Sequence, residues 1–280
     1  MLVKKIDEVR ELVKEWKKQG LTIGYVPTMG ALHEGHKSLI DRAVKENDKV
    51  IVSVFVNPTQ FGPNEDYDSY PRNIEKDMEL CESAGAAAVF NPEPYEMYFD
   101  NRSTTVSVSG LTGVLCGARR PGHFNGVCLV ITKFFNIVKP DRAYFGQKDA
   151  QQVAVLKRMV RDLSFDVEIV PCPIIREEDG LAKSSRNTYL NADERKAALV
   201  LSRSLKIAKG MLDNGERNAD KIKEAMTSEI NKEKLAKIDY VEIVDSEDLT
   251  SVCEIKKNIL VPIAVYIGKT RLIDNFTYEV

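Results

Sequence analysis

The chain is 280 residues long, with 43% hydrophobic and 29% charged residues, which suits one large domain or a main domain with a smaller second one. This composition is typical of a globular protein with a sizeable core and excludes a disordered chain. The formal net charge is -2, so no excess of positive charge would attract nucleic acid or an anionic membrane.

The N-terminal segment MLVKKIDEVRELVKEW mixes charges at helical spacing. It contains neither the apolar run of a signal peptide nor a stretch long enough to span a bilayer. We therefore expect a cytoplasmic protein. The five cysteines are scattered singly, without CxxC or metal-ligand spacing, so we expect neither a disulfide framework nor a zinc site.

Strands and helices are predicted to alternate along the first part of the chain. After a first amphipathic helix, buried strands over 21–26 and 49–56 flank a helix over 36–47, which makes a βαβ unit. The later segments comprise helices over 72–84, 125–138 and 149–162 and strands over 87–90, 141–145 and 167–170. This alternation predicts a doubly wound parallel sheet, that is, a Rossmann-like α/β domain over residues 1–174.

The pattern changes from about Pro171 onward. We predict two charged helices over 192–212 and 219–235, followed by strands over 240–244, 259–267 and 271–276. These segments predict a smaller C-terminal α+β domain over residues 175–280, which we expect to cover the active site.

The segment PTMGALHEGH, residues 27–36, lies between a predicted strand and a helix. At such a turn the free backbone N–H groups and the helix dipole favour an anion, so a nucleotide phosphate is a natural ligand. Gly30 and Gly35 would let the backbone approach it. His33 and His36 are three residues apart and could donate hydrogen bonds to the same phosphates; the alternative is that they cap the helix.

Polar residues also follow the next predicted strand, in FVNPTQFG, residues 55–62. Because the ends of parallel strands open on the same crevice, we expect Asn57 and Gln60 to face the cavity of the histidines. Gln60 can donate and accept hydrogen bonds, which suits a ligand with hydroxyls and a carboxylate. Taken alone, however, it is an ordinary loop residue.

Three further polar loops are candidates for phosphate or ribose contacts. Arg119, Arg120 and His123 lie in a Gly-containing loop that could supply positive charge or simply be solvated. The loop YFGQKD, residues 144–149, again ends a strand: its lysine could balance phosphate charge, and its aspartate could bind a ribose or cap the helix. The loop LAKSSRN, residues 181–187, contains a compact set of phosphate donors, or it is a charged interdomain turn.

These segments resemble known motifs in order and spacing. PTMGALHEGH resembles the HIGH signature of the nucleotidyltransferase superfamily, specifically in the form found in the pantothenate synthetase family. FVNPTQFGPNEDYDSYPR, RRPGHFNGV and VITKFFNIVKPDRAYFGQKDAQQ match the same family, and KSSRN is similar to its [LM]SSRN form of the KMSKS-type loop. Lys183 stands where leucine or methionine is usual.

The resemblance implies roles for individual residues. The second histidine, His36, would be an acid or proton donor, and the groups acting on the phosphates would be His33, His36, Lys148, Ser184, Ser185 and Arg186. ATP would be bound by Met29, Gly30, Ala31, Leu32, His33, Glu34, Gly35, His36, Gly146, Gln147, Lys148, Asp149, Ile175, Lys183, Ser184, Ser185 and Arg186. Pantoate would contact Gln60, Gln152, Asn57, Tyr70 and His123, and β-alanine would contact Gln60.

The implied reaction is the ATP-dependent condensation of (R)-pantoate with β-alanine to pantothenate, through a pantoyl-adenylate and with release of AMP and pyrophosphate. Mg²⁺ is expected mainly on the ATP phosphates, because no acidic pair indicates a dedicated metal site. The partners would be these small molecules and, by resemblance, a second copy in a homodimer, with no nucleic acid and no membrane. Rival interpretations are another adenylyl-transferring enzyme and a non-catalytic nucleotide-binding protein.

Overall fold

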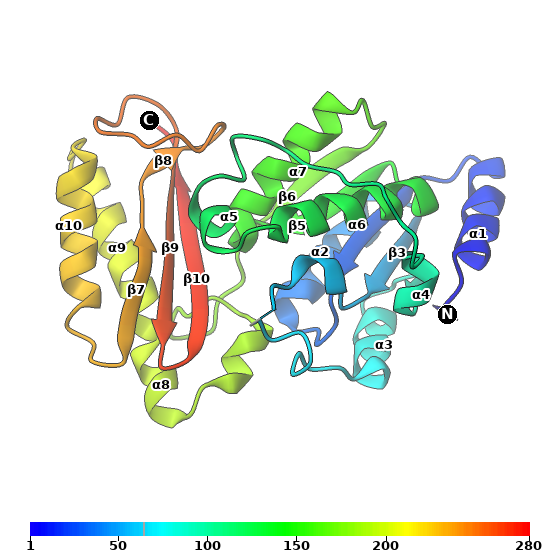
Figure 1. Ribbon diagram of the computed structural model, residues 1–280, viewed down its shortest axis with the longest axis horizontal. Coiled ribbons are helices and arrows are strands. Elements are labelled where there is room, and N and C mark those ends of the chain that lie inside the picture. Colours follow the sequence, from blue (N-terminus) through cyan, green and yellow to red (C-terminus); the bar gives the residue numbers. More distant parts are fainter. Residues whose placement is uncertain (64) are drawn as a thin grey trace. The chain divides into compact units, whose positions relative to one another are not determined.

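The computed structural model describes residues 1–63 and 65–280 and divides into two compact units (Figure 1). The first unit comprises Met1–Gln147 and Val155–Pro173, and the second comprises Lys148–Ala154 and Ile174–Val280. The sequence predicts a domain boundary between residues 174 and 175. In the structure, the second unit begins its main segment at Ile174 and also includes residues 148–154.

The first unit contains a sheet of six parallel strands, in the order β1-β4-β3-β2-β5-β6. The strands are β1 (Leu2–Val3), β2 (Ile23–Thr28), β3 (Lys49–Val54), β4 (Ala88–Phe90), β5 (Arg142–Gly146) and β6 (Glu168–Cys172). The chain runs outward from β2 through β3 to β4 and then returns to the other side of β2. The predicted doubly wound α/β class is therefore confirmed.

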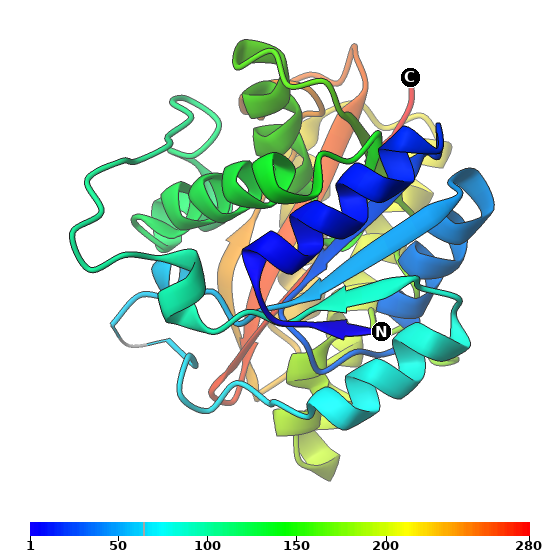
Figure 2. The same ribbon diagram turned by 90° about the vertical axis from the view of Figure 1, so that its right-hand side faces the viewer.

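The helical segments of this part of the chain connect the parallel strands. They are α1 (Ile6–Lys18), α2 (Glu34–Glu46), the 3₁₀ turn η1 (Pro58–Gln60), α3 (Ile74–Ser83), α4 (Pro94–Met97), α5 (Leu115–Arg119), α6 (His123–Val138), the 3₁₀ turn η2 (Gln147–Asp149) and α7 (Ala150–Asp162). Figure 2 shows α1 and α6 on one side of the sheet and α2 and α3 on the other. Both faces are thus covered, as a parallel sheet requires.

Neighbouring residues of β2 show how the two faces are filled. Tyr25 packs on Phe134 of α6, with ring centroids 5.6 Å apart. Val26, the next residue, belongs to the opposite apolar cluster with Leu39 and Ile40 of α2. Strand side chains alternate between the faces, so a strand that is apolar at consecutive positions can be buried on both sides.

Most predicted boundaries in this unit agree with the structure within two residues, and the short elements β1, α4 and α5 were not predicted. The predicted helix over 125–138 begins at His123. Gly122 supplies the reason: it precedes the helix with a left-handed backbone (φ 82°), a conformation that glycine adopts without strain.

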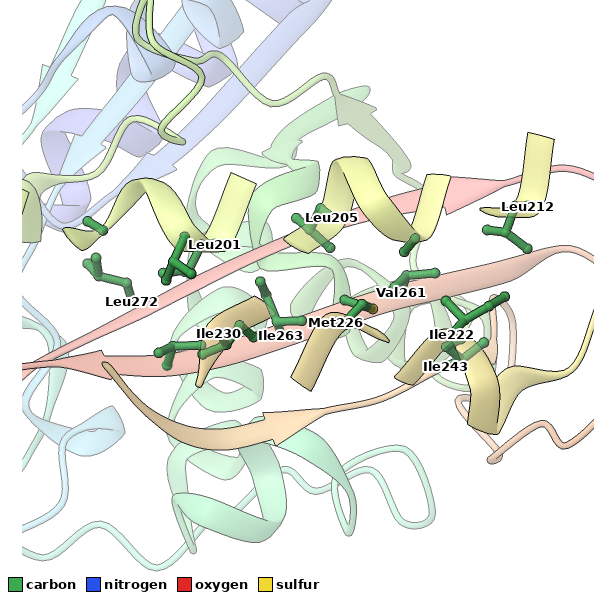
Figure 3. Packing of buried hydrophobic residues seen from close by; sticks show 14 of the residues in the cluster. Leu201, Leu205, Leu212, Ile222, Met226, Ile230, Ile243, Val261, Ile263 and Leu272 are labelled. Carbon is green, nitrogen blue, oxygen red and sulfur yellow. The ribbon is translucent and has the colours of Figure 1, made fainter. Parts of the chain in front are cut away.

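The second unit contains an antiparallel sheet in the order β10-β9-β7, with β8 pairing on β9. The elements are the 3₁₀ turn η3 (Ser185–Tyr189), α8 (Ala192–Ala197), α9 (Leu199–Asp213), α10 (Ala219–Ile230), β7 (Ala236–Val241), β8 (Val244–Asp245), β9 (Ile259–Ile267) and β10 (Thr270–Tyr278). Apolar side chains of α9 and α10 pack with those of the sheet (Figure 3), among them Leu201, Leu205, Met226, Val261 and Ile263.

Two predicted elements of this unit are subdivided. The helix predicted over 192–212 is interrupted at Ala198, which keeps a helical backbone (φ −58°, ψ −22°), so the interruption changes hydrogen bonding rather than chain direction. The strand predicted over 240–244 begins earlier, at Ala236, and is followed after a break by β8. A register shift between Ile238 and Tyr240 marks the irregular part of β7.

Candidate active site

Three adjacent strands of the first unit, β3, β2 and β5, end at the same edge of its sheet. The strand order reverses beside β2, because β3 and β4 lie on one side of it and β5 and β6 on the other. The crevice at such a reversal is where ligands bind in doubly wound sheets. In the first unit, the segments that follow β2 and β3 contain Met29–His36, Asn57 and Gln60, and β5 itself ends in Gly146.

The loop after β2 has an unusual backbone. Gly30 (φ 89°) and Ala31 (φ 52°) both adopt left-handed conformations, and for alanine this is strained. A side chain on Gly30 would place its Cβ 3.0 Å from a carboxylate oxygen of Asp77. The Thr28 hydroxyl accepts the N–H of Gly30 at 3.2 Å and donates to the carbonyl of Ser53 at 2.7 Å. Neighbouring segments therefore hold the loop in this shape.

Asp77, a residue of α3, anchors this loop and was not found by sequence reasoning. Its carboxylate accepts the N–H of Leu32 at 2.7 Å and the N–H of Ala31 at 3.1 Å. The residue is 2% exposed. Burial raises its pKa, and the two backbone hydrogen bonds act in the opposite direction. The sequence does place Asp77 four residues before the apolar Cys81, on the same face of the helix, and this spacing could have indicated a buried acid.

His33 and His36 lie at the start of α2 with ring centroids 4.2 Å apart. His33 accepts the N–H of Gly35 at Nδ1 (3.1 Å), and His36 accepts the N–H of His33 at Nδ1 (3.3 Å). A backbone N–H can only donate, so each Nδ1 lacks a proton and the neutral rings carry it on Nε2. Both imidazoles therefore cap the helix through Nδ1 and carry their proton on Nε2, which makes the two sequence-based interpretations compatible.

Asn57 and Gln60 meet at the turn η1, which follows β3. The Asn57 carbonyl oxygen accepts from the hydroxyls of Thr59 (2.9 Å) and Tyr98 (2.7 Å). Its NH₂ group therefore faces the Gln60 Oε1 at 3.0 Å and the carbonyl of Gly126 at 3.2 Å. Asn57 is 1% exposed, so its influence on a ligand passes through Gln60.

This network also fixes the orientation of the Gln60 amide. Because Oε1 accepts from Asn57, Nε2 is the end that remains a donor, and it lies 3.0 Å from the sulfur of Met29. A thioether is a weak acceptor that a substrate oxygen can replace. The structure thus brings together Met29 and Gln60, which were predicted for ATP and for the acid respectively.

The other two residues predicted for pantoate in this unit have protein contacts. Tyr70 is 6% exposed and stacks edge-on against Phe61, with centroids 6.1 Å apart. His123, at the start of α6, lies with Nδ1 2.8 Å from the carbonyl oxygen of Gln60. Both therefore contact the segment that carries the Gln60 amide.

β5 ends in Gly146, which is followed by Gln147 in η2. A Cβ on Gly146 would meet no atom within 4 Å, so close packing within the chain does not explain the glycine. This open backbone lies at the strand end where the sequence analysis predicted a phosphate or ribose contact.

In the second unit, the predicted residues lie in two segments. Lys148, Asp149 and Gln152 are in η2 and the first turn of α7. The carbonyl of Lys148 accepts from the side chain of Asn275 in β10 at 2.9 Å. Lys148 and Ser184 line one small cavity, together with Asn187 and Asp274. The structure therefore brings together two residues predicted to contact phosphate.

The loop predicted to fold over the triphosphate is held by an ion pair at its base. Arg176 contacts both carboxylate oxygens of Asp274, at 2.7 and 2.9 Å, and it also donates to the carbonyl of Gly180 at 3.0 Å. The Asp274 side chain is 1% exposed. A bidentate pair of this kind fixes the planar guanidinium in one orientation.

Within this loop, the N–H of Lys183 donates to the carbonyl of Ile175 at 2.9 Å, so two residues predicted for ATP are paired. The Lys183 ammonium lies 3.5 Å from Glu177, and its side chain is 18% exposed. Ser184 accepts the N–H of Arg186 at 3.3 Å and precedes η3, which begins at Ser185. The SSRN segment is therefore a capped 3₁₀ turn.

Among residues 1–63 and 65–280, no three His, Cys, Asp or Glu side chains are grouped so that they could hold a metal ion. The same described residues include no helix of sufficient length and apolarity to cross a membrane.

The family model for pantoate–β-alanine ligase matches residues 1–277. The chain belongs to this family. Family membership confirms the predicted activity, a ligase of pantothenate biosynthesis that joins pantoate to β-alanine.

Similar proteins agree with this ligase family over the whole chain. The pantothenate synthetase of Clostridium acetobutylicum is 69% identical, covering 98% of each chain. That of Clostridioides difficile is 66% identical, covering 100% of this chain and 99% of the relative.

Solved structures of the ligase family have the same architecture. The pantothenate synthetase of Thermus thermophilus gives a TM-score of 0.94 at 43% identity, covering 98% of each chain. The ligase of Francisella tularensis, described as complexed with β,γ ATP and β-alanine, gives a TM-score of 0.81 at 35% identity over 99% of this chain and 97% of that chain.

Proposed function

We propose that this ligase works in two steps, with the magnesium complex of ATP as a substrate. The pantoate carboxylate attacks the α-phosphorus of ATP to give pantoyl-adenylate and pyrophosphate, and the β-alanine amine then displaces AMP. A carboxylate is already ionised at neutral pH, so the first step needs no general base. Catalysis of this step is then a matter of positioning and of stabilising charge that develops on the phosphates.

The observation that carries the proposal is the arrangement of the two histidines. Because each Nδ1 accepts a backbone N–H, the neutral rings of His33 and His36 carry their protons on Nε2. Two fixed donors at a helix N-terminus suit the growing charge of the phosphates. We therefore assign the ATP phosphates to these rings and to the loop Met29–Gly35.

Gln60 is proposed to bind the acid. Its amide is oriented by Asn57 so that Nε2 donates, which suits the carboxylate or a hydroxyl of pantoate and the carboxylate of β-alanine. A neutral amide orients the attacking carboxylate without the tight charge pairing that an arginine would impose, so less of its nucleophilicity is lost. Asn57, Tyr70 and His123 support this amide, and Gln152 is proposed as a second amide for pantoate.

The second unit is proposed to supply the remaining nucleotide contacts. Lys148, Ser184, Ser185 and Arg186 would stabilise charge on the phosphates, with Gly146, Gln147 and Asp149 at the nucleotide and Ile175 at the adenine through its backbone. The Lys183 side chain pairs with Glu177 at 3.5 Å, so we propose that it contributes mainly through its backbone. The domain division at residue 174 remains part of this proposal.

Mg²⁺ is proposed to arrive on the triphosphate. The ion would be held by phosphate and water oxygens, which are the ligands that Mg²⁺ prefers. We also propose a cytoplasmic homodimer that binds neither nucleic acid nor membrane. Light scattering coupled to size exclusion measures whether the protein is a dimer.

The reaction is tested by incubating the protein with ATP, Mg²⁺ and pantoate, with and without β-alanine, while AMP and pantothenate are measured. We expect both products only with β-alanine present. His36→Ala should abolish most of the rate, whereas Lys37→Ala, the next residue in the same helix and paired with Asp41 at 2.7 Å, should not. A wild-type protein that binds ATP but forms no pantothenate would overturn the proposal.

A further inference from the structure

We propose that Glu65 and Arg120 are positioning residues for the acid-binding amide of Gln60 and that they act through His123. This inference rests on the proposed role of Gln60 in binding pantoate. None of the predicted roles for this region included Glu65, and Arg120 was predicted only as a possible source of charge for phosphate.

The ion pair between these residues has a specific geometry. Arg120 donates from Nε to Glu65 Oε1 and from Nη2 to Oε2, both at 2.6 Å. The side chains are only 19% and 25% exposed. A bidentate pair that is mostly shielded from water fixes the plane of the guanidinium far better than a single exposed contact.

The third nitrogen of the Arg120 guanidinium, Nη1, connects this ion pair through His123 to the main chain of Gln60. Nη1 lies 3.1 Å from His123 Nε2, and His123 Nδ1 lies 2.8 Å from the carbonyl oxygen of Gln60. A guanidinium can only donate and a carbonyl can only accept, so the ring must accept at Nε2 and donate at Nδ1. His123 is thus neutral with its proton on Nδ1, the opposite tautomer from His33 and His36.

The backbone under Gln60 has no room to move toward α6. A Cβ on Gly126 of that helix would lie 2.2 Å from the Thr59 carbonyl oxygen and 2.6 Å from the Gln60 nitrogen. The turn η1 is therefore in direct backbone contact with the helix. The chain Glu65–Arg120–His123 holds the same turn from the side, through its last carbonyl.

Gln60 is consequently fixed at two points. His123 holds its main-chain carbonyl, and Asn57 holds its side-chain Oε1, which leaves Nε2 as the donor for a ligand. The contact at the main-chain carbonyl sets the position of Gln60 and thereby the place where the acid binds. A misplacement of about 1 Å can cost around a hundredfold in rate, so this contact should affect catalysis. Glu65 also occupies two of the Arg120 donors, so those donors are not available to bind the substrate carboxylate as an ion pair.

The test is the kinetics of Glu65→Gln, which keeps the shape of the side chain and removes its charge. We expect kcat/KM for pantoate to fall about tenfold, as for directly coupled neighbours, while KM for ATP changes less than about twofold. His123→Asn keeps a donor near the Nδ1 position and should retain more pantoate specificity than His123→Ala. The double variant Glu65→Gln/His123→Ala should have the same kcat/KM for pantoate as His123→Ala alone. The reason is that Glu65 acts on Gln60 only through His123.

The matched control is Glu46→Gln, which removes a carboxylate paired with Arg42 at 2.9 Å in the last turn of α2, away from the carboxyl ends of the strands. Equal losses for pantoate and ATP in Glu65→Gln, or none, would overturn the inference. If Glu65→Gln does not fold, Arg120→Lys takes its place. We expect the same result, a lower kcat/KM for pantoate with a nearly unchanged KM for ATP. Failure of the wild type to use pantoate would instead overturn the proposed function, so the two failures are distinguishable.

Discussion

Replacing Asp77 by asparagine tests how the loop Thr28–His33 obtains its shape. In the native protein the two carboxylate oxygens accept from Leu32 at 2.7 Å and from Ala31 at 3.1 Å. Asparagine has one acceptor oxygen, and its NH₂ group would face a backbone N–H. One of the two anchoring hydrogen bonds is then replaced by a contact between donors.

The magnitude follows from the cost of a buried donor without an acceptor, about 1–3 kcal/mol. We expect this free energy to be lost from the loop conformation that binds ATP. At 1.4 kcal/mol for each factor of ten, kcat/KM for ATP then falls about 5- to 150-fold. Global stability should respond differently. Burial raises the pKa of Asp77, so a neutral amide removes a desolvation cost, and the unfolding midpoint should change little.

The assay is the initial rate of AMP formation with ATP varied and pantoate and β-alanine saturating, and then with pantoate varied. Glu75→Gln, an exposed acid two residues earlier in α3, is the control. Unchanged ATP kinetics in a folded Asp77→Asn protein would refute the reasoning, as would a large loss of stability without a kinetic effect.

Three other perturbations give independent checks. Gly126→Ala should lower kcat/KM for pantoate and cost about 1–3 kcal/mol in urea unfolding, because its Cβ would lie 2.2 Å from a backbone oxygen; wild-type kinetics would contradict this. Asp274→Asn should destabilise the second unit by about 3 kcal/mol, seen as a lower denaturation midpoint, since Arg176 loses a partner that is 1% exposed. Burial raises the pKa of Glu65, but the hydrogen bonds and charge of Arg120 outweigh it, so this pKa lies below its ordinary 4.5. The pair therefore stabilises the protein above pH 4.5 and is lost as the pH falls through the lowered value, so wild type and Glu65→Gln should converge in acid unfolding.

The parts of the site that could be predicted from the sequence are those made by consecutive residues. His33 and His36 stand where an apolar strand pattern changes to a helical one, and Gln60 follows the next strand, so local patterns placed all three at strand ends. A parallel sheet brings such ends to one edge. The doubly wound fold and the family followed from the same short segments.

The supporting contacts could not be predicted because they join residues far apart in the sequence. Asp77 is 45 positions from Leu32, and Glu65 is 55 positions from Arg120. Each is an ordinary acid in its own local segment. The tautomers of the histidines were also inaccessible, since they depend on which backbone group faces each ring nitrogen.

The position of β2 in the middle of its sheet has a consequence for synthesis. The N–H of Ile23 donates to Asp141, 118 positions later, and β2 pairs with β5 from that point onward. At about 5–20 residues per second, the ribosome needs on the order of 10 s to complete this partner. During that time β2 has one unpaired edge, so nascent chains that end before β5 should depend on chaperones and should aggregate when released early.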